Sequence, residues 1–174
     1  MAIRQVRVQG DDILTKKARP VTNYNPILHE LLDDMLETLR AKDAVGIAAP
    51  QVGVLRRIVV VEMDDEHYEM INPEIVSCDG NQSCNEACLS VPGKCGDIDR
   101  PFEITVRAQN RNGEEYTVKL DEFMASAVCH EIDHLEGVLF TDTATNIQYI
   151  TNEQAAERKK LRMNRRQRRL NRNR

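Results

Sequence analysis

Residues 122–136, EFMASAVCHEIDHLE, restrict most strongly how this chain can fold. Asp121 is a suitable N-cap for a helix over this segment, and a glycine follows its end. Apolar residues cover almost the whole circumference of this helix, so it has to be buried inside the molecule. A buried helix that carries His130, Glu131 and His134 must offer these polar groups a partner. The rest of the chain therefore has to surround this helix and complete a polar site on it.

We expect antiparallel strands to form most of the shell around that helix. Alternating apolar and polar residues predict the strands, and Asn112-Gly113 between two of them is typical of a tight hairpin turn. Residues 78–97 are rich in Cys, Gly, Asn and Ser, and we expect them to be loop with one short extended piece. Strands are predicted at 58–63, 68–77, 102–110 and 114–120.

Two further helices are predicted on either side of the strands in sequence. Asn25 can cap an amphipathic helix over residues 26–42, in which leucines recur at helical spacing. Thr151 and Gln154 match a capping box, which predicts a C-terminal helix. The expected fold class is α+β, with antiparallel β-sheets packed around a central buried HExxH helix and with a C-terminal helix.

The segment HEIDH, residues 130–134, has the spacing of a catalytic metal site. Two histidines four residues apart on a helix point to within roughly 40° of each other, so both can bind one ion. In such sites the intervening glutamate lies beside the water that attacks the substrate. Two hydrogen-bonded core histidines would give the same pattern, so the question is whether a third ligand exists.

A catalytic site of this kind needs a third protein ligand and one open coordination position. Cys88, in the segment EACLSVPG, can supply a thiolate, and the backbone N–H of Leu89 can then face the ion. The odd number of cysteines, five, argues against a disulfide framework. A structural zinc site made by Cys84, Cys88 and Cys95 is an alternative, although the spacing fits no common Cys-x-x-Cys knuckle. The cysteines expected to be small buried residues are Cys78, Cys95 and Cys129.

Three segments resemble, in order along the chain, the signature motifs of the peptide deformylase family. They are GIAAPQVG at 46–53, EACLSVPG at 86–93 and HEIDHLEG at 130–137. The likeness continues in INPEI and GVLFTD and covers roughly residues 5–150. Members of this family remove the formyl group from N-formylmethionine at the start of newly made bacterial proteins. The resemblance therefore implies a hydrolase that acts on formylmethionyl peptides and releases formate.

The resemblance also implies the residues of the site. The implied metal ligands are Cys88, His130 and His134, and the implied general acid/base is Glu131. The developing oxyanion is held by Gln51 and the backbone N–H of Leu89, and Gly46 lets the peptide backbone approach. The implied ion is Fe²⁺, which Ni²⁺, Co²⁺ or Zn²⁺ can replace.

Ala44 and Ala87 stand where the family usually has glycine, and each adds one methyl group. Ala87 is tolerated if its backbone is extended and harmful if its φ is positive.

Helical phase also suggests a pocket for the methionine side chain. Phe123 and Ala127 share the side of the helix that carries His130, and we expect them to form one wall, with Val45 opposite. Packing in the core is the alternative for these residues. Arg100 is expected to pair with Glu86 and to brace the loop that carries the third ligand.

The net charge of −4 hides a strong asymmetry. Ten of the 24 Lys and Arg lie from residue 158 onward, where there is no acid, and the rest of the chain has 14 basic and 28 acidic residues. A basic tail on an acidic body predicts contact with nucleic acid, here the ribosome, and a solubilising frayed end is the alternative. We expect residues 1–150 to form the catalytic domain and 151–174 to form an appended helix and basic tail.

No apolar run approaches the roughly 20 residues that a membrane helix needs. The N-terminus lacks the apolar core of a signal peptide, so we expect a cytoplasmic monomer with no membrane contact. A zincin-like protease is one rival function, which would need a third His, Glu or Asp ligand downstream. No histidine follows His134, and Glu157 is a conceivable ligand but lies in the basic helix. The other rival is a catalytically weak or inactive relative that binds the ribosome or RNA through the basic tail.

Overall fold

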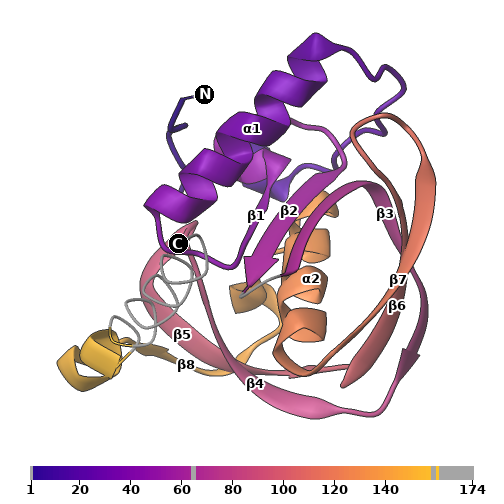
Figure 1. The fold of residues 1–174 in the computed structure, drawn as a ribbon. Coiled ribbons are helices and arrows are strands. Elements are labelled where there is room, and N and C mark those ends of the chain that lie inside the picture. The colour runs from indigo at the N-terminus through magenta and orange to yellow at the C-terminus, as the bar shows by residue number, and fades with distance from the viewer. Residues whose placement is uncertain (1, 64–65, 158–159, 161–174) are drawn as a thin grey trace, which may run out of the picture.

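Two antiparallel sheets surround α2 (Glu122–Leu135) in the structure, a computed structural model that describes residues 2–63, 66–157 and 160 (Figure 1). The larger sheet has the strand order β1-β2-β3-β6-β7, and the smaller one has the order β4-β5-β8. The predicted α+β class is confirmed. The strands are β1 (Gly46–Ala48), β2 (Ile58–Met63), β3 (Glu66–Asp79), β4 (Gln82–Cys88), β5 (Val91–Arg100), β6 (Glu103–Gln109), β7 (Glu115–Asp121) and β8 (Thr145–Tyr149).

The strand β2 separates two layers of the core, and its side chains alternate between them. Val59 and Val61 face α2, whereas Ile58 and Val60 face α1 (Pro26–Ala41). A strand covered on both faces has to be apolar throughout, which explains the unbroken run IVVV. The strand is thereby fixed between the two helices.

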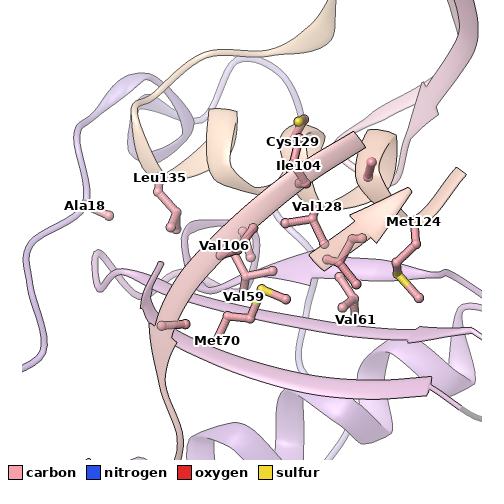
Figure 2. Close-up of a cluster of buried hydrophobic side chains, with 14 residues drawn as sticks. Ala18, Val59, Val61, Met70, Ile104, Val106, Met124, Val128, Cys129 and Leu135 are labelled. Carbon is pink, nitrogen blue, oxygen red and sulfur yellow. The ribbon is translucent and has the colours of Figure 1, made fainter. Parts of the chain in front are cut away.

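The side of α2 that faces the larger sheet is packed with apolar side chains. Figure 2 shows Met124 and Val128 of α2 beside Val61, Ile104 and Val106 of the sheet, and all five are at most 3% exposed. The predicted burial of this helix is confirmed, because its polar residues 130, 131 and 134 are also at most 9% exposed. Asp121 is the N-cap residue, as predicted, but its side chain makes no capping hydrogen bond.

The helix α1 begins where predicted. The Asn25 side chain accepts a hydrogen bond from the Leu28 N–H at 3.1 Å. The buried face of α1 packs on β1 and β2 through Leu32, Met35 and Leu39, which are fully buried. This packing fixes the position of β1, which carries part of the site.

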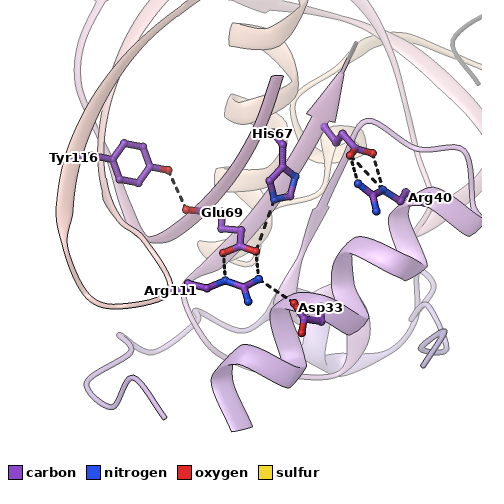
Figure 3. A network of polar contacts seen from close by, with 7 residues as sticks. Asp33, Arg40, His67, Glu69, Arg111 and Tyr116 are labelled. Atoms are coloured by element: carbon purple, nitrogen blue, oxygen red, sulfur yellow. Dashed lines mark hydrogen bonds and ion pairs between the residues drawn. The ribbon is translucent and has the colours of Figure 1, made fainter. Parts of the chain in front are cut away.

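Polar contacts also join α1 to β3 and to the hairpin between β6 and β7 (Figure 3). Arg111 in the hairpin turn donates to Glu69 of β3 at 2.9 Å and to Asp33 of α1 at 2.9 Å. The Tyr116 hydroxyl donates to the Glu69 carbonyl at 2.9 Å. Burial alone would raise the pKa of Glu69, but hydrogen bonds from His67 and Arg111 outweigh it and lower this pKa to about 2.

The prediction of loop over residues 78–97 was wrong, because most of this segment lies in β4 and β5. Gln82 pairs with Arg100 and Glu86 pairs with Gly96, so the two strands form a long hairpin. The composition of this segment disfavours strands, but the hydrogen bonds that β5 makes with β4 and β8 outweigh that preference. Cys78 is exposed rather than buried, because residues 76–80 run past the core after a β-bulge in β3.

The predicted capping box is present at the C-terminal helix. The Thr151 N–H donates to Gln154 Oε1 at 2.9 Å, and the Gln154 N–H donates to Thr151 Oγ1 at 3.2 Å. Residues 152–157 are helical. The basic tail, apart from Lys160, lies outside the described residues. Within the described part of the chain, every helix is too short or too polar to cross a membrane.

Candidate metal centre

Cys88, His130 and His134 meet at one point between β4 and α2. Their candidate ligand atoms all lie within 4.8 Å of one another. Cys88 Sγ is 3.2 Å from His134 Nε2, and the two imidazole rings are 5.0 Å apart and nearly perpendicular, at 83°. The sequence segments that supply these side chains are 42 residues apart, so the strand β4 brings the sulfur to a helix that the chain forms much later.

These residues fit a metal ion. One thiolate and two imidazoles are a donor set that suits Zn²⁺ and other first-row transition metals. The buried oxygen Oε2 of Glu131, the residue next to His130, has no hydrogen-bond partner within the described residues. Ligand groups elsewhere in the described chain do not gather in this way, so the alternative zinc site through Cys84 and Cys95 is not formed.

A buried ion pair holds the His130 ring in place. His130 Nδ1 lies 2.7 Å from Glu86 Oε2, and the Arg100 guanidinium donates to both Glu86 oxygens at 2.8 and 3.1 Å. The expected pairing of Arg100 with Glu86 is confirmed. Burial would raise the pKa of Glu86, but hydrogen bonds from His130 and Arg100 outweigh it and lower this pKa to about 2. An ionised Glu86 favours the tautomer with its proton on Nδ1, which leaves Nε2 free to bind a metal.

Two partners of this ion pair were not predicted from the sequence. Arg100 also donates to Asp133 Oδ2 at 2.7 Å, and the Ser126 hydroxyl donates to Glu86 at 3.3 Å. Asp133 lies inside the HEIDH segment and Ser126 lies one helical turn before His130. Helical spacing could have placed both beside His130, but it does not show that β4 and β5 reach them.

Glu131 is packed against the backbone of Gly46. A Cβ atom added to Gly46 would lie 2.5 Å from Glu131 Oε1, so any larger residue would displace the carboxylate. The Glu131 side chain is buried, and this burial raises its pKa to about 7 although the nearby His130 opposes the shift. A carboxyl group with this pKa can both accept and return a proton near neutral pH.

Gln51 turns its amide nitrogen toward the thiol. Its Oε1 accepts from the Ala48 N–H at 2.7 Å, which fixes the orientation of the amide group. Its Nε2 therefore lies 3.5 Å from Cys88 Sγ and 3.3 Å from Ser90 Oγ. Since Leu89 follows Cys88 directly in the chain, the two expected oxyanion donors, Gln51 and the Leu89 N–H, belong to the same small region.

The residues that differ from the family pattern are accommodated. Ala87 lies inside β4 and does not have a positive φ, so the extended case holds. Ala44 also lacks a positive φ and packs against the core beside α1.

The residues expected to line a methionine pocket differ in their exposure to solvent. Val45 and Ala127 are partly buried, whereas Phe123, in the first turn of α2, is 50% exposed. All three are partly exposed, and their role in a methionine pocket stays a prediction.

Comparison with known proteins gives a consistent result. A family model for polypeptide deformylase matches residues 3–149. A peptide deformylase of Acetivibrio thermocellus is 48% identical over 159 residues, which cover 91% of this chain and 92% of that protein. One of Thermoanaerobacter pseudethanolicus is 45% identical and is covered over its full length, by 92% of this chain. The solved peptide deformylase structure of Thermotoga maritima has a TM-score of 0.81 at 38% identity, with 83% of this chain and 99% of that chain covered. The one of Legionella pneumophila also has 0.81, at 35% identity over 95% and 96% of the two chains.

Proposed function

This chain belongs to the peptide deformylase family, whose members remove the N-terminal formyl group of nascent polypeptides. We propose that the chain removes this group with the site built on α2. In this proposal Cys88, His130 and His134 hold the metal ion of this metal-dependent enzyme. The observation that supports these roles most strongly is the convergence of a thiol and two imidazoles beside the buried Glu131.

The proposed resident ion is Fe²⁺, with Ni²⁺, Co²⁺ or Zn²⁺ able to replace it. The mixed sulfur and nitrogen donors support an ion of this group rather than Mg²⁺ or Ca²⁺, which prefer oxygen ligands. When bound, such an ion makes a water molecule a better nucleophile and polarises the formyl carbonyl. The ring of His130, held by Glu86, and the thiol of Cys88 at the end of β4 keep the ligands in one geometry.

Glu131 is the proposed general acid/base. Water adds to the formyl carbon, and Glu131 accepts the proton that this water loses. The carboxylic acid then donates that proton to the leaving nitrogen as the carbon–nitrogen bond breaks, which gives formate and a free amino terminus. A pKa of about 7 supports both halves of this cycle near neutral pH. The glycine at position 46 gives the carboxylate room to take this place.

The developing oxyanion is proposed to accept hydrogen bonds from Gln51 Nε2 and from the Leu89 N–H. The fixed orientation of the Gln51 amide supports this role, because its carbonyl oxygen is already bonded to the Ala48 N–H. Losing one such donor costs about 3 kcal/mol in the activation barrier. The peptide is proposed to pass beside Gly46, with the methionine side chain between Val45 on one side and Phe123 and Ala127 on the other.

Residues 1–150 are proposed to form the catalytic domain, and 151–174 an appended helix and basic tail that docks on ribosomal RNA. The ten basic residues from 158 onward support electrostatic docking near the exit of new chains. We further propose that the enzyme works in the cytoplasm as a monomer. The ligand set, which is complete within one chain, supports the monomer.

Formate release from a formyl-Met peptide tests the proposed roles. The protein is purified without oxygen, and wild type is compared with Glu131→Gln. Glu136→Gln is the matched control, because Glu136 lies at the end of the same helix and binds Lys17 and Arg57 instead of facing the site. We expect Glu131→Gln to lose at least about 100-fold in kcat while keeping its metal. Equal rates for the two variants would overturn the role of Glu131.

A further inference from the structure

The N-terminal residues 7–9 cross the outside of the site and bind both segments that carry the proposed oxyanion donors. The Arg7 N–H donates to the carbonyl of Gln51 at 2.8 Å, and the Gln9 N–H donates to the carbonyl of Ser90 at 2.7 Å. Ser90 directly follows Leu89. We call residues 7–9 the strap.

The two segments that the strap joins belong to different sheets. Gln51 lies in the short helix after β1 of the larger sheet, and Ser90 lies in the turn after β4 of the smaller sheet. Strand pairing within the described residues does not connect these sheets. The direct contact between the segments is made by the Gln51 side chain itself, at 3.3–3.5 Å. The backbone bonds of the strap are therefore an independent link between the donors.

The geometry of the strap suits a spacer. In an extended segment, the N–H groups of residues i and i+2 point the same way and lie roughly 6–7 Å apart. Arg7 and Gln9 are two residues apart, and a turn begins at Gln9. The N–H of Val8 between them donates no hydrogen bond within the described residues. Two donors at a fixed spacing thus set the distance between the carbonyls of Gln51 and Ser90.

Side chains at both ends hold the strap in place. The Arg7 guanidinium lies over Gly53, where an added Cβ would come within 3.2 Å of it, and it also reaches Asp11 at 3.6 Å. Gln9 Nε2 lies 3.5 Å from Thr141 Oγ1. All three strap residues are nevertheless exposed, so the strap contributes little to the core.

We propose that Arg7 and Gln9 are positioning residues for catalysis, because their backbone N–H groups hold the two oxyanion donors at the correct separation. This inference rests on the proposed roles of Gln51 and Leu89. Catalysis depends steeply on such placement, since a displacement of about 1 Å can cost roughly 100-fold in rate.

Proline scanning of the strap in the full-length, metal-loaded enzyme tests the proposal, because proline removes a single backbone N–H. We expect Arg7→Pro and Gln9→Pro each to lower kcat roughly tenfold, with KM and metal content within about twofold of wild type. Val8→Pro is the matched control, since it places the same ring in the strap but removes no hydrogen bond; its kcat is expected to stay within about twofold. Arg7→Ala and Gln9→Ala measure how much of the fall in kcat comes from losing each side chain. Each proline variant must lower kcat more than the alanine variant at the same position.

A double variant separates failure of this proposal from failure of the proposed function. If Arg7 acts through Gln51, Arg7→Pro should slow wild type but should have no further effect in Gln51→Ala. A slow Gln51→Ala enzyme together with equal kcat in Arg7→Pro, Gln9→Pro and Val8→Pro would overturn the strap alone. An unchanged rate in Gln51→Ala would overturn the oxyanion role on which the strap depends. A fall in kcat explained by lost metal would also overturn the proposal.

Discussion

Replacement of Glu86 with glutamine tests how the metal ligand His130 is held. The variant keeps the length of the side chain but removes its charge. It leaves the Arg100 guanidinium, whose side chain is 9% exposed, without the carboxylate it binds at 2.8 and 3.1 Å. Breaking a buried pair in this way costs about 3–5 kcal/mol. Because Arg100 keeps Asp133 at 2.7 Å, we expect a loss near the lower limit, about 3 kcal/mol.

The same change should weaken metal binding. The Glu86 carboxylate is 2.7 Å from His130 Nδ1, and an uncharged amide holds that ring and its tautomer less firmly. Loss of such a partner typically weakens metal affinity by about 10–100-fold. We therefore expect the Kd for Zn²⁺ or Co²⁺ to rise by at least about tenfold.

Both effects can be measured with one control. Glu74→Gln also removes the acid of an Arg–Glu pair, but its Arg107 and Glu74 side chains are 47% and 62% exposed, so it should cost less than about 1 kcal/mol. Stability is measured by urea unfolding of the metal-free proteins, and Kd by competition with a chromophoric chelator. Equal losses of stability in the two variants would show that the Glu86–Arg100 pair does not stabilise the fold. An unchanged Kd in Glu86→Gln would show that Glu86 does not hold His130 for the metal.

Three further predictions concern other parts of the molecule. Gly46→Ala should lower formate release by at least about 100-fold with metal content retained, because its Cβ would displace Glu131; a wild-type rate would contradict this packing. In the metal-free protein, Glu69→Gln should cost about 2 kcal/mol at pH 7. Folding lowers the pKa of Glu69 from 4.5 to about 2, so wild type should lose this stability as the pH falls through that range, and the variant should not. Parallel curves of unfolding free energy against pH for the two proteins would exclude this linkage. Met70→Ala should lower the free energy of unfolding by about 3 kcal/mol in the same urea titrations, and a loss below about 1 kcal/mol would show that Met70 is not in the core.

Much of the fold could be predicted because its elements carry local signals. The helix α1 has a cap and a regular leucine pattern, and β6 and β7 alternate around an Asn-Gly turn. The strands β4 and β5 were missed because their composition resembles a loop, and only pairing across the chain makes them strands. Strands whose stability comes from distant partners leave little trace in their own sequence.

The candidate site was predicted to a different extent for each residue. Helical spacing placed His130 and His134 together. The chemistry of the segment EACLSVPG made Cys88 a candidate third ligand, and the family resemblance then implied it. The burial of Glu131 against Gly46 could not be read from sequence, because it depends on how β1 meets α2. The strap was missed for the same reason, since its contacts are made by backbone groups that every residue carries.

X-ray absorption spectroscopy of the metal-loaded protein tests the proposed metal centre most directly. We expect one sulfur and two nitrogen donors from the protein, and no sulfur donor in Cys88→Ser. A wild-type spectrum without a sulfur donor, or a sulfur donor that persists in Cys88→Ser, would contradict the proposed ligand set.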